Sequence, residues 1–133
     1  MFQSVRRFQT LCWSGVLSCL LFGCGGPVRA KPVQVDVAHK TLVDVLDHWK
    51  GGGSIEDLRK RRPEIVAQEF FWTKGMKLQE YRILDDGRSE NANLRCEVEL
   101  TLIPEDGGAP TKKTVNYLIG THPVLTVFRE VGG

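Results

Sequence analysis

The chain carries little net charge, and almost none of it lies beyond the first 23 residues. Its 133 residues include 18 Lys and Arg against 16 Asp and Glu, a formal net charge of +2. Arg6 and Arg7 lie within residues 1–23, which hold no acid, so the remainder of the chain is formally neutral. Binding to nucleic acid needs a basic surface or a concentrated basic stripe. The charge balance therefore argues against nucleic acid as a partner.

Motifs with a known chemistry are also missing. The sequence has no glycine-rich nucleotide loop, catalytic triad, metal-ligand cluster or paired carboxylates, and we expect no cofactor. Asp44 and His48 lie four apart in a helical pattern, with His39 and Asp47 nearby, but no third metal ligand is clearly placed. We interpret them as a solvated helix face, and His122 as a turn residue.

Cysteine is scarce. Cys12 and Cys19 lie within residues 1–23, which leaves Cys24 and Cys96. If Cys24 is modified, Cys96 has no partner for an intramolecular disulfide. Cys96 stands among alternating apolar residues, so we expect a small buried side chain rather than a nucleophile. The roughly 110 residues after position 23 are enough to bury one core without disulfides.

No apolar run is long enough to favour a membrane span. The longest, residues 8–23, has roughly 16 residues and contains several polar ones, whereas a transmembrane helix needs about 20. Preceded by Arg6 and Arg7, it is typical of a secretory signal peptide. The residues around this arginine pair match a twin-arginine signal poorly, which favours ordinary export of an unfolded chain.

The end of this segment, Leu21-Phe22-Gly23-Cys24, resembles the lipobox of bacterial lipoproteins. The resemblance implies a signal peptide over residues 1–23, cleavage after Gly23 and a diacylglycerol on Cys24. It also implies an address in the bacterial cell envelope, anchored to a membrane on its non-cytoplasmic side. Several acyl chains on one cysteine would make the anchor permanent. A poorer match ending at Cys19 and a plain secreted protein are the alternatives.

A tether and one domain follow. Residues 24–32 are rich in glycine and proline without apolar periodicity, and residues 25–32 can hold the domain up to roughly 26 Å from the anchor. Residues 33–133 form the single domain. Residues 33–37 alternate like a short strand or a surface-bound extended segment. An amphipathic helix is predicted over 38–50, a second from Ser54 through Arg62, and a third over 64–72 with Pro63 in its first turn.

The second half of the domain predicts strands. Residues 77–84 are rich in strand formers, and residues 94–102 alternate between apolar and polar. Further strands are predicted over 112–119 and 124–129, separated by turn signals at 85–87, 104–110 and 120–123. Helices followed by an antiparallel meander give an α+β fold.

This layout resembles the cystatin-like and nuclear transport factor two-like superfold. The positions that carry the resemblance are Trp72, Gly75, Leu78 and Tyr81, with the later runs 115–119 and 127–129. The resemblance implies amino-terminal helices packed on a curled four-stranded antiparallel sheet. Such folds host enzymes, carriers and association modules, so they do not determine function.

Two surface features stand out. Arg59-Lys60-Arg61-Arg62 is the densest charge run; cations are favoured and solvated near a helix carboxyl end, and the alternative is contact with anionic lipid headgroups. Residues 70–72, Phe-Phe-Trp, cannot all face inward on one helix, so at least one should be exposed or line a cavity mouth.

Two classes of function remain. The first is a lipid-anchored binding or assembly module without evident catalysis, which contacts a protein partner or a second copy. The second is a small-ligand carrier or enzyme that uses a pocket between helices and sheet. A filled space under the sheet favours association, whereas an open one with converging polar groups favours chemistry.

Overall fold

Helix α1, Val35–Lys50, opens the part of the chain that the structure describes, residues 31–132 of a computed structural model. The helix predicted over 38–50 is confirmed, and its apolar stripe is the buried face: Ala38, Leu42, Val45, Leu46 and Trp49. The strand expected over 33–37 does not form, because the helix already begins at residue 35. Asp36 lies in the first turn, where the helix dipole favours an acid.

The next segment is a 3₁₀ helix, η1, Ile55–Lys60, and it ends two residues earlier than predicted. Ser54 precedes it but makes no side-chain capping hydrogen bond. Leu58 is its one buried residue and fixes the segment against the core.

The prediction of a third helix over 64–72 is wrong. Its first part is strand β1, Ile65–Gln68, and its last part belongs to a single-turn helix α2, Phe70–Thr73. A short apolar run is ambiguous between strand and helix from periodicity alone. These residues form a strand because they pair with β6, Leu125–Arg129. The two strands are parallel, with Ile65 beside Leu125 and Gln68 beside Phe128.

The remaining strands are β2, Lys77–Ile83; β3, Arg88–Glu90; β4, Asn93–Ile103; and β5, Thr111–Gly120. β2 and β3 pair antiparallel with successive parts of β4, which pairs with β5, which pairs with β6. The α+β class is confirmed, but the sheet is mixed and has six strands in the order β1-β6-β5-β4-β2 with β3 beside β4. The expected four-stranded antiparallel sheet lacked β1 and β3.

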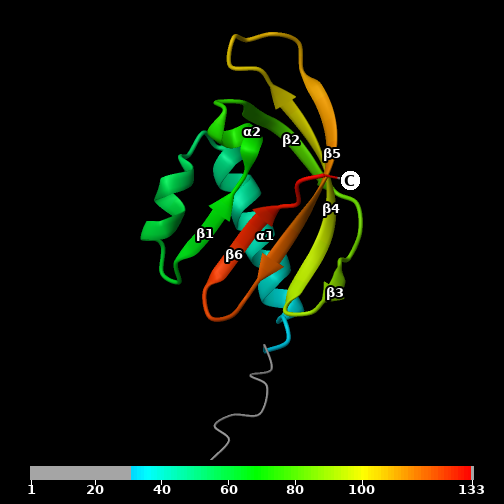
Figure 1. The fold of residues 1–133 in the computed structure, drawn as a ribbon. Coiled ribbons are helices and arrows are strands. Elements are labelled where there is room, and N and C mark those ends of the chain that lie inside the picture. Colours follow the sequence, from blue (N-terminus) through cyan, green and yellow to red (C-terminus); the bar gives the residue numbers. More distant parts are fainter. Residues whose placement is uncertain (1–30, 133) are drawn as a thin grey trace, which may run out of the picture.

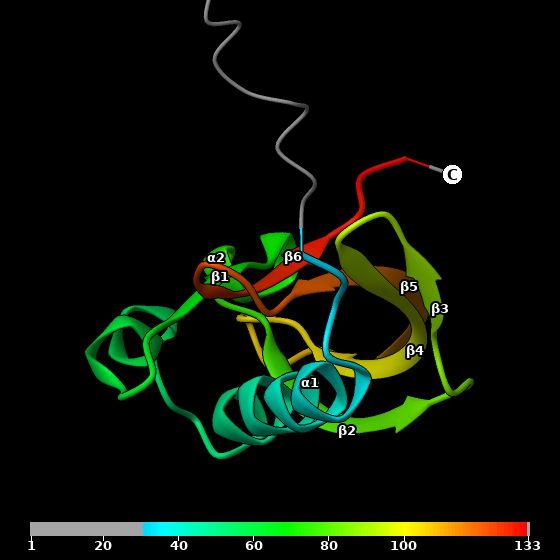
Figure 2. The ribbon, with the colours of Figure 1, turned by 90° about the horizontal axis from the view of Figure 1, so that it is seen from below.

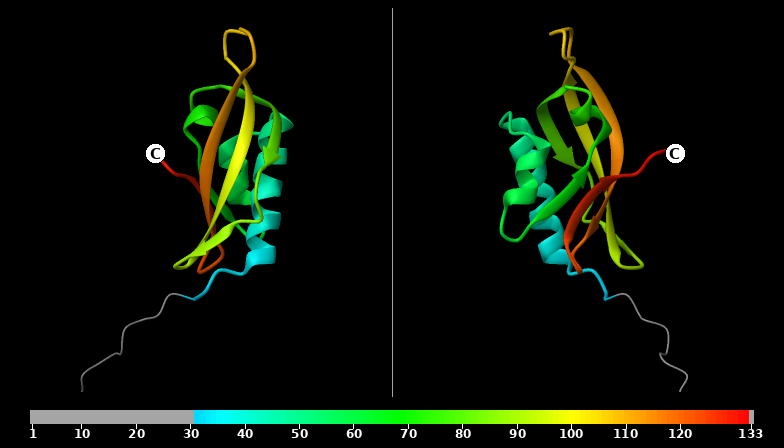
Figure 3. Two further views of the ribbon diagram at one scale, coloured as in Figure 1. Left: turned by 90° about the vertical axis from the view of Figure 1, so that its right-hand side faces the viewer. Right: turned by 60° about the vertical axis from the view of Figure 1, so that its left-hand side comes forward.

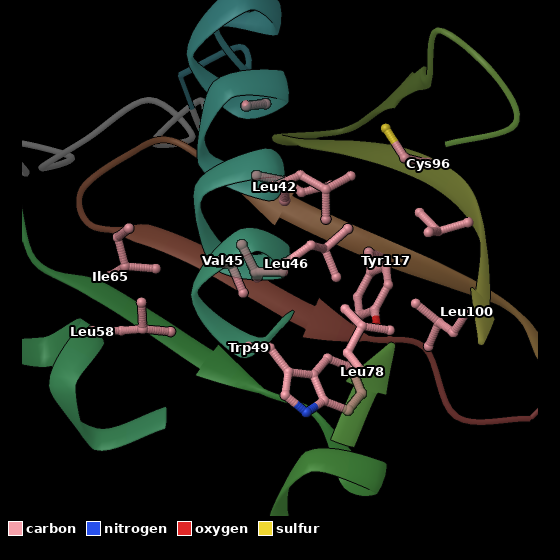
Figure 4. Close-up of a cluster of buried hydrophobic side chains, with 14 of the residues drawn as sticks. Leu42, Val45, Leu46, Trp49, Leu58, Ile65, Leu78, Cys96, Leu100 and Tyr117 are labelled. Atoms are coloured by element: carbon pink, nitrogen blue, oxygen red, sulfur yellow. The ribbon is translucent and has the colours of Figure 1, made fainter. Parts of the chain in front are cut away.

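The sheet curls into a half-barrel around α1 (Figures 1 and 2). Every second residue of β4 from Leu94 to Leu102 is buried, and these side chains meet the apolar face of α1. Figure 4 shows this cluster, in which Leu42, Leu46 and Trp49 of the helix approach Leu100 and Tyr117 of the sheet. Side chains therefore fill the space under the sheet.

The molecule has two opposite ends, named here the basal end and the α2 end. The basal end comprises the first turn of α1, the loop 61–63 and the turn 120–124, where the described chain begins (Figure 3). Gln34 N–H donates to Thr121 Oγ1 there, at 3.0 Å. The α2 end comprises α2 and the residues that follow β1 and β6. Because these two strands are parallel, both run from the basal end to the α2 end.

Candidate functional site: a buried ion pair beneath Phe70

Glu69, Arg129 and Tyr117 meet at the α2 end. Gln68 pairs with Phe128 in the parallel ladder, so the next residues, Glu69 and Arg129, lie side by side. Tyr117 is opposite Arg129 in the antiparallel β5–β6 ladder. Three elements far apart in sequence thus bring a carboxylate, a guanidinium and a phenol together.

Glu69 accepts hydrogen bonds from three donors. Its Oε1 accepts from the backbone N–H of Phe71 at 2.8 Å and from Arg129 Nη1 at 3.1 Å, and its Oε2 accepts from the Tyr117 hydroxyl. The bond to Phe71 also caps the amino terminus of α2. Glu69 is only 4% exposed. A buried carboxylate is tolerated when it is paired and hydrogen-bonded in this way.

Burial first, and then the Glu69 carboxylate, raise the pKa of Tyr117 well above its usual 10.0. Tyr117 therefore keeps its proton and donates it to Glu69 in a hydrogen bond. With both oxygens of Glu69 engaged, the cluster offers no free general base. Its chemistry is that of a fixed structural pair, and it positions the residues above it.

Two aromatic rings lie over the pair. The Arg129 guanidinium stacks on Phe71 at 4.0 Å from the ring centroid and stands 5.5 Å from that of Phe70. Lys74 Nζ lies 4.1 Å from the Phe70 centroid. Such cation–π contacts hold an aromatic ring in place at the surface. Phe70 is nevertheless 51% exposed, which confirms that residues 70–72 do not all face inward.

Beside Phe70 the surface is hollowed by a pocket of about 380 Å³. Its lining combines apolar groups with the edge of the ion pair: Ile55, Ala67, Gln68, Glu69, Phe70, Thr73, Arg129 and Val131. Val131 is 85% exposed, and Arg129 Nε is buried without a hydrogen-bond partner in the described residues. An apolar group fits the mainly apolar lining of this pocket.

The acidic and imidazole side chains of α1 do not come together at one site. Asp47 Oδ1 accepts from the Tyr81 hydroxyl at 2.6 Å, and burial and this carboxylate raise the pKa of Tyr81 to about 12. His39 contacts the carbonyl of Asp86, so it points away from Asp44 and His48. Within residues 31–132, no three His, Cys, Asp or Glu side chains are grouped to hold a metal.

His48 is less solvated than its helical position predicts. Its Nε2 lies 2.8 Å from the carbonyl of Ser54, and its ring packs at 6.0 Å from that of Trp72. Trp72 in turn stacks on Trp49 at 5.3 Å. The expectation of a solvated face is therefore wrong for His48, which supports the connection after α1.

Cys96 and His122 lie where the sequence placed them. Cys96 is fully buried, and burial raises the pKa of its thiol to about 11. His122 is exposed in the turn between β5 and β6. Neither is part of the site at the α2 end.

The basic run 59–62 divides into two pairs. Arg59 contacts Glu64 at 3.3 Å and Lys60 contacts Asp57 at 3.8 Å, both as exposed ion pairs. Arg61 and Arg62 make no ion pair within the described residues, and they line a separate groove at the basal end.

Sequence reasoning did not single out Glu69, Tyr117 and Arg129 as a site. It placed Glu69 only within the helix predicted over 64–72 and Tyr117 only within the strand predicted over 112–119. The crowding of aromatics at 70–72 was the available signal, because it indicated a surface-exposed ring next to Glu69.

The lipobox residues Leu21-Phe22-Gly23-Cys24 lie outside the described residues, as does most of the tether. Among residues 31–132, no helix is long and apolar enough to cross a membrane. No protein family model, curated protein or solved structure matches the chain.

Proposed function

We propose that this protein is a lipid-anchored binding or assembly module of the bacterial cell envelope, which contacts a protein partner through the surface around Phe70. The observation that carries the proposal is a contrast. The space between α1 and the sheet is filled, whereas Phe70 is held outward above a buried ion pair. Recognition then takes place on the outside of the fold rather than inside it.

The leader supports the anchoring half of the proposal. Leu21-Phe22-Gly23-Cys24 follows an apolar segment with a basic start, as in lipoproteins. Residues 25–32 are a short tether, which confines the domain to within roughly 26 Å of the anchor. The lipid on Cys24 would then make a membrane surface the permanent neighbour of the domain.

The α2 end supports the binding half. Interface hot spots are enriched in aromatic and arginine residues beside well-packed pockets. Phe70, Arg129 and the adjoining pocket of about 380 Å³ have this composition. Because Phe70 and Arg129 are fixed before any partner arrives, little conformational entropy is lost on binding.

The half-barrel around α1 is in keeping with a cystatin-like or nuclear transport factor two-like domain, and we include that relationship in the proposal. The parallel β1–β6 pair is the feature that departs from the expected meander. A ligand carrier or enzyme with a pocket under the sheet is the second candidate, but the buried cluster of α1, β4 and β5 occupies that space.

Anchoring is tested by expression in a bacterial host with radiolabelled palmitate. The parent is expected in the membrane fraction, labelled and released only by detergent, and Cys24→Ser is expected to lose the label. Cys19→Ser is the matched control, because it removes the competing cysteine and should leave labelling unchanged. An unlabelled soluble parent would refute the anchor.

Binding is tested by a photo-crosslinking amino acid introduced at position 70 in living cells, with position 84 as the control. Leu84 is also an exposed apolar residue, at 39%, but it follows β2, which β5 and β4 separate from β6 in the sheet. A discrete adduct is expected at position 70 alone, and it should disappear in chains that also carry Val131→Glu. Equal adducts at both positions, or none, would contradict the proposal.

A further inference from the structure

A groove of about 320 Å³ opens at the basal end, between α1 and the loop that leads into β1. Three cations, Lys40, Arg61 and Arg62, and the carboxylate of Asp44 line it. The rest of its lining is Thr41 and four apolar residues: Val37, Pro63, Ile65 and Leu125. Lys40 lies 3.4 Å from Asp44, so this carboxylate has its own cation. The two arginines remain as the uncompensated charge of the groove.

The Arg62 side chain is held against the loop. Arg62 Nη1 donates to the carbonyl of Arg61 at 3.0 Å, which ties its guanidinium back to the loop. Neither residue forms an ion pair within residues 31–132, in contrast to Arg59 and Lys60 next to them. Guanidinium groups presented together in this way suit phosphate oxygens.

Apolar side chains flank the groove at the same end. Val35 and Val37 in the first turns of α1 and Val124 in the β5–β6 turn are 37–41% exposed. These are three of the six large apolar residues exposed in the described chain. Cations interspersed with exposed apolar residues are the composition of a surface that lies in a lipid headgroup layer.

The start of the described chain is at this end. Gln34 is fixed to Thr121 in the turn that also holds Val124, and the nine residues 25–33 connect it to Cys24. A lipid on Cys24 would therefore hold the basal end, and not the α2 end, nearest to the membrane (Figure 3).

From the groove, the valines and the attachment point together, we infer that the basal end docks on an anionic phospholipid surface, with a lipid phosphate at Arg61 and Arg62. This inference rests on the proposed anchor at Cys24. It orients the domain, because docking at the basal end turns Phe70 at the α2 end away from the bilayer. Each cation near an anionic membrane strengthens association about fivefold, so the two arginines account for about 25-fold.

The test uses the mature lipidated protein in vesicles that contain a spin-labelled phosphatidylcholine quencher. A fluorophore is attached at Val124→Cys, or at Val131→Cys at the α2 end; native Cys96 is buried and stays unlabelled. With phosphatidylglycerol in the vesicles, we expect strong quenching at position 124 and little at position 131. With phosphatidylcholine alone, quenching at 124 should fall.

Charge reversal separates the groove from general attraction. Arg61→Glu with Arg62→Glu should reduce quenching at 124 to the level in neutral vesicles. Arg59→Glu with Lys60→Glu changes the net charge equally but leaves the groove intact, and quenching should persist. Equal losses in both variants, or quenching at 124 that does not depend on anionic lipid, would overturn the groove. A protein that does not float with any vesicle would overturn the anchor itself, and the docking with it.

Discussion

The basal end and the α2 end carry similar residue types in opposite states. At the α2 end, Arg129 is committed to Glu69 and to the ring of Phe71. At the basal end, Arg61 and Arg62 have no acidic partner in the described part of the chain. A cation that is already paired gives rigidity and shape, whereas an unpaired one remains available to a phosphate. In the function we propose, the paired end serves a protein partner and the unpaired end serves the membrane.

The largest expected effect comes from breaking the pair at the α2 end. Glu69→Ala leaves Arg129 buried without its carboxylate, so we expect the free energy of unfolding to fall by about 3–5 kcal/mol. Urea unfolding followed by near-ultraviolet circular dichroism measures it. Arg61→Ala with Arg62→Ala at the basal end is the contrast and should change stability by less than about 0.5 kcal/mol. Equal effects at the two ends would abolish the distinction.

Alkaline pH should weaken the α2 end through Tyr117. Because the pKa of Tyr117 is raised by folding, only the unfolded chain ionises this phenol above its usual pKa of 10.0. The stabilisation from Tyr117 is thus complete below pH 10 and is lost as the pH rises further. Tyr117→Phe removes this dependence, so the stability gap between parent and variant should narrow above pH 10 in thermal melts. A constant gap up to pH 11 would show that Tyr117 titrates equally in both states.

A smaller effect is expected from Cys96, in the core between the two ends. The pKa of its thiol rises from 9.0 to about 11 through burial, so the native protein should resist iodoacetamide at pH 8 and react after denaturation. Cys96→Ala should fold with a modest loss of stability, about 1 kcal/mol. Rapid alkylation of the native protein would show that the core opens at β4.

The smallest effect concerns metal. Asp44 and His48 turn to different partners, so zinc should not raise the melting temperature of the parent above that of Asp44→Ala with His48→Ala. Differential scanning calorimetry with and without zinc measures this difference. A rise in the parent alone would reveal a site and reopen the enzyme alternative.

Local pattern predicted those elements in which one face of the helix or strand is apolar and the other is polar. The alternation over 94–102 predicted β4, because one face of this strand is buried and the other is partly exposed to solvent. Helix α1 followed from its apolar stripe for the same reason. Residues 64–68 were assigned to a helix because the partner that makes them a strand is β6, whose first paired residue lies 60 positions later.

The candidate site could not be predicted from local sequence pattern for a similar reason. Glu69 is 48 residues from Tyr117 and 60 from Arg129, so no spacing rule relates them. The basic run 59–62 shows that residues adjacent in sequence need not share one role. Four neighbouring cations suggested one patch, but Glu64 and Asp57 engage two of them and leave the other two in the basal groove.

The parallel β1–β6 pair also sets the order in which the chain can fold. β1 leaves the ribosome or a translocation channel long before β6, and Ile65 cannot join the sheet until Leu125 has followed. Contacts of such long sequence separation form late, since the intervening chain must first be ordered. Glu69 also waits for Arg129, the last residue of β6. Until that moment β1 remains an unpaired apolar segment, so the arrival of β6 determines when the domain becomes safe from aggregation.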